Sequence, residues 1–237
     1  MAEMIIKDER GFNQVFAAVG STPFRQQRRN DWVLQQIAAV KARRVLEIGS
    51  GTGECAAYLA AHSDAEVIGV DISPAFISAS RGNYQAPNLR YELFDLLGDK
   101  PLEFGTFDMV CGNGILHHLV LELPAVLKSL RRLTNPGGGL AFIEPNFLNP
   151  YCAFIFGTKI GRRMAKLEPD EKAFKPWHLR SALADAGWHD VQVTTRDFLI
   201  PGIPEALVSP TLAVEPLLEA TAATRWLAQS HFMIARA

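Results

Sequence analysis

The sequence has few cysteines, almost no net charge and no internal repeat, and each shortage excludes a class of protein. Its 237 residues contain three cysteines, Cys55, Cys111 and Cys152, with no pair at a metal-ligand spacing. We therefore expect free thiols in a reducing compartment. Lys and Arg number 24 against 25 Asp and Glu, so the net charge of −1 provides no basic field for a nucleic acid.

Long apolar runs are also missing. No run approaches the roughly 20 residues of a membrane-spanning helix, and residues 1–10 carry five charges without the apolar core of a signal peptide. We therefore expect a cytoplasmic protein. With 48% apolar residues, a chain of this length suits one domain that buries about 70% of its unfolded surface without a metal or a disulfide.

Short β-branched and apolar segments alternate with helical segments through the middle of the chain. Strands are predicted at 44–48, 66–70, 89–93, 107–111 and 140–144, with helices at 54–62, 74–81 and 121–133. Two more strands are predicted at 191–195 and 231–235, after a helix at 177–186. This alternation indicates an α/β protein with a Rossmann-like, doubly wound parallel sheet and helices on both faces.

We divide the predicted single domain, 1–237, into four parts. Residues 1–40 look helical, most clearly over 31–40, and form a cap, and residues 41–145 form the cofactor-binding core. Residues 146–175 are a lid insertion in which aromatic side chains precede basic ones. Residues 176–237 hold the last helix and strands, with four prolines that predict an irregular excursion with short helical pieces. The apolar content of 198–227 suits a homodimer surface or a buried cover equally well.

A glycine-rich turn follows the first predicted core strand. Between Gly49 and Gly53, three glycines alternate with hydroxyl residues, and a helix begins directly afterwards. Glycine lets the backbone approach a ligand where a side chain would clash, and the start of a helix presents unpaired amides. The next strand ends at Asp71, and a carboxylate at that place can accept hydrogen bonds from both ribose hydroxyls of a nucleoside.

Two classes of ligand fit this layout. Gly51, Gly53 and Ala56 satisfy the G-x-G-x-x-G/A pattern of nicotinamide dinucleotide sites. Glu47 and Glu54 flank the turn, however, and two negative charges disfavour a pyrophosphate but suit a ligand with an ammonium and a sulfonium. The residues alone therefore leave a nicotinamide-dependent oxidoreductase as an alternative.

Together these segments resemble the class I S-adenosylmethionine-dependent methyltransferases, in the group with methyltransferase type 11 or type 25 domains and small-molecule acceptors. The resemblance rests on five motifs in order, at 47–53, 71, 94–96, 107–119 and 130–143. It implies a seven-stranded sheet whose last strand is antiparallel. It also implies S-adenosyl-L-methionine as cofactor, with S-adenosyl-L-homocysteine as product. The cofactor-binding residues implied are Glu47, Gly49, Ser50, Gly51, Asp71, Ile72, Asp95, Leu96 and Asn113.

The resemblance also suggests what several of these residues do. Asp95 is expected to face the adenine amino group, with the backbone of Leu96 against the ring, and Ile72 is expected to pack on the adenine. Asn113 begins the loop that meets the methionine end of the cofactor in this family. Glu47 either organises the glycine turn or contacts the methyl donor.

Three residues are candidates for a catalytic base: His117, His118 and Glu144. Neighbouring histidines in a helix or turn point in different directions, so at most one is expected to face the acceptor, and each could instead be structural. Glu144 ends a strand at the edge where α/β sheets bind ligands, and it either acts on the acceptor or holds the following insertion. The three show no established metal-ligand spacing, and we predict no metal.

The predicted activity is methyl transfer from S-adenosylmethionine to the oxygen or nitrogen of a small organic acceptor, by in-line displacement. The aromatic part of the lid predicts an apolar or amphiphilic acceptor, and its basic end leaves contact with a membrane surface open. The alternative within the family is a non-catalytic partner protein that binds S-adenosylmethionine or S-adenosylhomocysteine.

Overall fold

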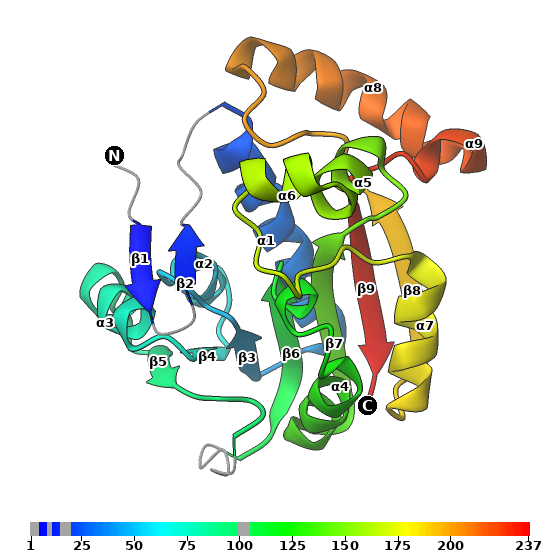
Figure 1. Cartoon of the computed structure of the whole chain (residues 1–237). Coiled ribbons are helices and arrows are strands. Elements are labelled where there is room, and N and C mark those ends of the chain that lie inside the picture. Colours follow the sequence, from blue (N-terminus) through cyan, green and yellow to red (C-terminus); the bar gives the residue numbers. More distant parts are fainter. Residues whose placement is uncertain (1–4, 9–10, 15–19, 99–104) are drawn as a thin grey trace.

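Seven strands form one mixed sheet in the order β5-β4-β3-β6-β7-β9-β8 (Figure 1). The computed structural model describes residues 5–8, 11–14, 20–98 and 105–237. Within the sheet, β3 to β6 and β7 run parallel, whereas β9 pairs antiparallel with both β7 and β8. The strands are β3 (Arg44–Ile48), β4 (Glu66–Asp71), β5 (Leu89–Leu93), β6 (Phe107–Asn113), β7 (Thr134–Pro145), β8 (His189–Arg196) and β9 (Ser230–Arg236). The predicted Rossmann-like sheet with an antiparallel last strand is confirmed.

Helices cover both faces of this sheet because alternate strand residues are apolar on both sides. On one face, α1 (Thr22–Val40), α2 (Glu54–Ala61) and α3 (Pro74–Asn83) bury side chains such as Ile37 and Leu59 against Val45 and Val67. On the other face, α4 (Leu123–Leu133) and α7 (Pro176–Asp185) pack against Leu46 and its neighbours. The predicted helices of the core are therefore present, with ends that differ by a few residues.

The N-terminal prediction was partly wrong. Helix α1 is longer than the predicted 31–40 segment, but the chain before it contains a hairpin of β1 (Ile5–Asp8) and β2 (Gly11–Gln14) rather than helix. The β-branched pair at the start of β1 favours a strand over a helix. The rest of the predicted 1–40 cap, at 1–4, 9–10 and 15–19, lies outside the described residues.

Strand β7 begins six residues earlier than predicted, at Thr134. The Pro-Gly turn at 136–139 was expected to precede the strand, but it lies within it. A register shift absorbs the extra residues, because Phe107 pairs with Thr134 whereas Met109 already pairs with Gly139. A bulge of this kind lets a turn-like segment remain part of a ladder.

The lid insertion and the C-terminal excursion meet at the end of the sheet where β6 and β7 finish (Figure 1). The lid contains α5 (Pro150–Gly157) and α6 (Lys159–Met164), and it returns to the sheet through a bridge between Asn146 and Phe174. The excursion contains a short 3₁₀ turn, η2 (Glu205–Leu207), then α8 (Val208–Ala220) and α9 (Ala222–Arg225). Its 13-residue α8 is longer than the short pieces predicted. None of the helices in the described part of the chain could span a membrane.

Candidate cofactor and acceptor site

The glycine-rich turn between β3 and α2 curls over the tip of β4. The amides of Gly49 and Ser50 both donate to the carbonyl oxygen of Val70, at 2.9 and 3.0 Å. The three glycines have φ values of 70°, 52° and 96°, a region that side-chain-bearing residues rarely adopt. A Cβ on Gly49 would lie 2.7 Å from Ile115, but one on Gly51 would meet nothing within 4 Å. The turn therefore offers the backbone at Gly51 to a ligand.

Asp71 ties this turn to the next helix. Its Oδ2 accepts a hydrogen bond from the amide of Gly51 at 3.0 Å, and its Oδ1 accepts one from the amide of Ser73 at 2.9 Å. The N-cap of α3 is Ser73 itself, whose side chain accepts from Phe76. The half-buried Asp71 therefore joins the glycine turn to the start of α3, at the strand tip where the sequence predicts a ribose contact.

Glu47 lies beneath the turn with an unsatisfied oxygen. The residue is 3% exposed, and its Oε2 has no hydrogen-bond partner among the described residues, nor has the buried Oγ of Ser50. Burial raises the pKa of Glu47 to about 7, although hydrogen bonds from Cys55 and Ala56 oppose the shift. Leaving such atoms unpaired costs about 1–3 kcal/mol each. A ligand with cationic or hydrogen-bond-donating groups would satisfy them.

We predict that Glu47→Gln stabilises the free protein increasingly as pH rises. Because the folded-state pKa is raised from 4.5 to about 7, the folded protein retains a proton that the unfolded chain releases. The contribution of Glu47 to the free energy of unfolding of the wild type therefore falls as the pH rises from 4.5 to about 7. The total fall is at most about 3 kcal/mol. Urea unfolding at pH 5 and pH 8 measures the effect. The exposed Glu54→Gln is the control, and an equal gain for both variants at pH 8 would contradict the prediction.

The predicted adenine contacts lie along the same edge of the sheet. Asp71 and Leu93 are register partners at the ends of β4 and β5, so Ile72 and Asp95 follow directly after two neighbouring strand tips. Asp95 is exposed, and its Oδ1 accepts from the amide of Leu97 at 3.0 Å. Leu96 is half-buried and packs against the core. The structure thus brings the predicted nucleoside residues to one edge of the sheet.

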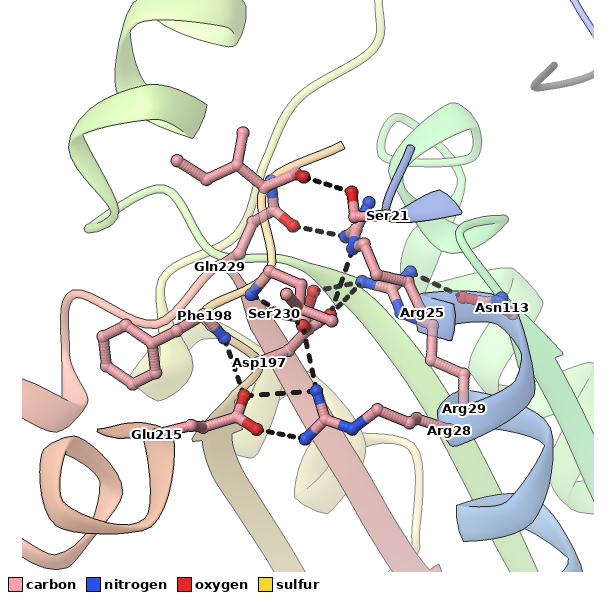
Figure 2. Close-up of polar contacts among 12 residues, drawn as sticks. Ser21, Arg25, Arg28, Arg29, Asn113, Asp197, Phe198, Glu215, Gln229 and Ser230 are labelled. Atoms are coloured by element: carbon pink, nitrogen blue, oxygen red, sulfur yellow. Dashed lines mark hydrogen bonds and ion pairs between the residues drawn. The ribbon is translucent and has the colours of Figure 1, made fainter. Parts of the chain in front are cut away.

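Asn113, at the end of β6, is held by an arginine from the N-terminal helix. Arg29 of α1 donates from Nη1 to Asn113 Oδ1 at 3.1 Å and from Nη2 to Asp197 Oδ2 at 2.9 Å (Figure 2). It also donates to Ser230 Oγ at 2.6 Å. The position of the Asn113 side chain therefore depends on a polar network that spans most of the chain.

Three arginines of α1 converge on two buried acids in this network (Figure 2). Asp197 is 4% exposed and lies 3.4 Å from Arg25 Nε, and Glu215 of α8 pairs with Arg28. Burial and, to a smaller extent, the neighbouring charge of Arg29 lower the pKa of Arg25 to about 10, against the opposing effect of Asp197. This network was not predicted from the sequence. The helical spacing of the arginines is visible there, but Asp197 lies 168 residues after Arg29 and Glu215 lies 187 residues after Arg28.

Glu144 and His117 form a rigid pair beside the glycine turn. Glu144 is 1% exposed, and its Oε1 accepts from the amides of Ile115 and Leu116 at 2.9 and 2.7 Å. Its Oε2 accepts from the amide of His117 at 3.2 Å and lies 2.9 Å from His117 Nδ1. The buried carboxylate thus caps the 3₁₀ turn η1 (Leu116–His118) and fixes the imidazole.

His118 pairs with a different acid, in the lid segment, although its ring lies 4.1 Å from that of His117. Its Nδ1 is 3.4 Å from Oε1 of Glu171, a 5%-exposed acid in the segment after α6. Burial alone would lower the pKa of His118, but the hydrogen bond and charge of Glu171 outweigh it and raise that pKa. Glu171 was not predicted as a site residue, because no motif in the sequence links an acid at this position to a histidine about 50 residues earlier.

Comparison with known proteins supports a methyltransferase domain in the middle of the chain. A methyltransferase domain matches residues 46–140, the segment that holds the glycine turn and strands β4 to β6. This match to a methyltransferase domain agrees with the resemblance to the class I S-adenosylmethionine-dependent methyltransferases. The cofactor expected from the sequence is confirmed at the level of the family, and the nicotinamide alternative is not supported.

Individual relatives resemble parts of the chain. Highly reducing polyketide synthase 40 of Fusarium pseudograminearum is 28% identical over 172 residues, which cover 66% of this chain but only 7% of the synthase. Trans-aconitate 2-methyltransferase of Deinococcus radiodurans is 39% identical over 103 residues, covering 43% of this chain and 38% of that enzyme. Among solved structures, an S-adenosylmethionine-dependent methyltransferase from Mesorhizobium loti shares the fold, with a TM-score of 0.62 and 18% identity over 88% of this chain and 98% of its own.

Proposed function

We propose that the protein transfers the methyl group of S-adenosylmethionine to an oxygen or nitrogen atom of a small organic acceptor, and that His117 removes the acceptor's proton. The observation that carries the proposal is the His117–Glu144 pair, with 2.9 Å between Nδ1 and Oε2. The loop that bears it touches the glycine turn, since Ile115 fills the space beside Gly49. A base at this place adjoins the cofactor-binding residues.

The chain's own residues fit the cofactor. Glu47 Oε2 and Ser50 Oγ are buried and unpartnered, and the open space at Gly51 leaves the backbone accessible. We propose that these groups and Asn113 hold the amino-acid end of the cofactor, and that Asp71, Ile72, Asp95 and Leu96 hold its nucleoside. When bound, S-adenosylmethionine would supply a methyl group on a sulfonium: the acceptor atom would bond to the methyl carbon in line with the breaking S–CH3 bond, and S-adenosylhomocysteine would leave.

The three candidate bases divide into different roles. Glu144 accepts four hydrogen bonds, so we assign it the positioning of His117 rather than proton removal. Because Nδ1–H of His117 is directed at this carboxylate, Nε2 carries the lone pair that a base needs. A positioned base of this kind contributes about 10²–10⁴-fold to the rate. His118, paired with Glu171, holds the lid segment.

A small acceptor is supported by the surroundings of His117. Phe156 of α5 meets the His117 ring edge-on, with 5.8 Å between ring centroids, so an aromatic lid residue borders the base. The balanced charge of the chain argues against a nucleic acid. The relative named for trans-aconitate also acts on a small organic molecule, which favours this class of acceptor.

Calorimetric titration with S-adenosylmethionine and S-adenosylhomocysteine tests the cofactor site. Asp71→Ala is expected to weaken binding by about 1–3 kcal/mol, because charged hydrogen bonds to the ribose are lost. Asp64→Ala, an exposed acid just before β4, is the matched control and should bind as wild type. Wild-type affinity in Asp71→Ala would contradict the assigned ribose contact.

Formation of S-adenosylhomocysteine with a panel of small hydroxy, carboxylic and amino compounds then tests the transfer itself. The expected result is acceptor-dependent product in wild type, reduced by about 5- to 150-fold in Asp71→Ala at subsaturating donor because cofactor binding is weaker. Tight cofactor binding without donor consumption by any class of acceptor would favour the non-catalytic binding protein.

A further inference from the structure

Two histidines and a buried acid form a cluster that the proposed transfer does not fully use. His117, His118 and Glu171 each offer one ligand atom, and these atoms lie within 4.8 Å of one another. The two imidazole rings are 4.1 Å apart and tilted by 37°. From the sequence, the two histidines were grouped with Glu144 and no metal was predicted. The structure shows that Glu144 serves His117 Nδ1, whereas Glu171 is the acid that faces His118.

The orientation of His117 matches that of a metal-ligating histidine. Metal-bound histidines commonly donate their other ring N–H to a carboxylate, which fixes the tautomer and raises the basicity of the ligating nitrogen. Glu144 supplies this carboxylate, at 2.9 Å from Nδ1, and is itself held by three backbone amides. The nitrogen left to ligate an ion is Nε2.

The second and third ligands come from His118 and the lid. Glu171 is 5% exposed, and a buried carboxylate of this kind is paired or binds a metal. Its segment is attached to the histidine turn, because the amide of Lys172 donates to the carbonyl oxygen of His117 at 3.2 Å. The His118 side chain is 38% exposed, so the cluster has an entry path from solvent.

We propose that His117, His118 and Glu171 bind a divalent transition-metal ion, Zn²⁺ by preference, and that the bound ion inhibits methyl transfer. Two imidazole nitrogens and one carboxylate oxygen are a ligand set that suits Zn²⁺, with a water as the fourth ligand. An ion on Nε2 of His117 occupies the lone pair assigned to proton removal. The inhibitory part rests on the proposed function, whereas the binding part does not.

Metal binding is tested without cofactor or acceptor. Protein dialysed against EDTA, then against buffer, is titrated with Zn²⁺ in a calorimeter, and wild type is expected to bind one equivalent. His118→Ala and Glu171→Gln should each lose this saturable binding, and Glu144→Gln should weaken it by about 10–100-fold as an orienting partner. His189→Ala removes an exposed histidine at the start of β8 and should bind as wild type.

Circular dichroism establishes that each variant is folded before titration. Absence of one saturable equivalent in wild type, or unchanged binding in both His118→Ala and Glu171→Gln, would overturn the metal site. Zn²⁺ should also suppress product formation by wild type but not by Glu171→Gln. Stoichiometric Zn²⁺ binding with no transfer under any condition would retain the site and reject the proposed function, whereas transfer without Zn²⁺ binding would do the reverse.

Discussion

Asp197→Asn is expected to lower the free energy of unfolding by about 3–5 kcal/mol, the cost of leaving buried cations without their partner. Asp197 pairs with Arg29 at 2.9 Å, Arg25 at 3.4 Å and Arg28 at 3.8 Å. In the variant, Arg28 still pairs with Glu215, but Arg25 and Arg29 lose the one carboxylate of this network with which they pair. Asparagine preserves the shape of the side chain and tolerates the left-handed backbone, with φ at 77°.

The matched control is an acid with a similar arrangement at the surface. Glu66 also faces two arginines, Arg44 and Arg90, but its side chain is 37% exposed. Such pairs contribute about 0–1 kcal/mol, so Glu66→Gln should change stability little. Urea unfolding followed by circular dichroism measures both variants under the same conditions. A loss in Asp197→Asn no greater than that in Glu66→Gln would show that the buried network is not stabilising.

The same variant is expected to weaken binding of S-adenosylmethionine. Arg29 donates hydrogen bonds to both Asp197 and Asn113. Without the Asp197 carboxylate, Arg29 is held less firmly, and so is Asn113, which we propose contacts the cofactor. The network thus links the stability of the N-terminal helix to the cofactor site.

The arginines of this network occupy one face of α1, a pattern that is visible in the sequence. Their partners, however, lie far along the chain, directly after β8 and in α8. Contacts between such distant segments depend on the tertiary fold, which local patterns do not specify.

Local patterns were sufficient for the core because its strands are short, apolar and bounded by turn residues. The predicted 44–48 and 89–93 segments are the strands β3 and β5 without change. The N-terminal hairpin was missed because four-residue strands are too short to show a period of two against a helical background. The four prolines of the C-terminal excursion predict only short helical pieces, but α8 continues through Pro216.

The parts of the candidate site that backbone geometry defines could be predicted from the sequence. The parts that depend on which side chains pair with each other could not. Gly49, Gly51 and Asp71 are joined as a turn and strand tip, which the spacing of glycines and acid already indicated. The pairing of two histidines with two different acids was not predictable. The two imidazole rings lie 4.1 Å apart, but Nδ1 of His117 faces Glu144 of β7 and Nδ1 of His118 faces Glu171 of the lid segment.

His117→Ala is expected to reduce the rate of methyl transfer by about 10²–10⁴-fold while leaving cofactor affinity unchanged. Glu144→Gln should cause a loss of similar size for a different reason. At the Oε2 position the amide would present a donor, so Nδ1 of His117 would have to accept a hydrogen bond. The proton would then move to Nε2, which could no longer act as a base.

The rate of methyl transfer by both variants is measured in single-turnover experiments with the acceptor found in the panel, in the presence of EDTA to remove metal ions. Calorimetric titration with S-adenosylhomocysteine measures the cofactor affinity separately. His178→Ala, an exposed histidine on α7, is the control and should transfer as wild type. A neutral amine sheds its proton readily after transfer and needs no base. A loss of less than tenfold in both His117→Ala and Glu144→Gln would therefore reject His117 as the base. A large loss in His117→Ala alone would retain the base but remove the positioning role of Glu144.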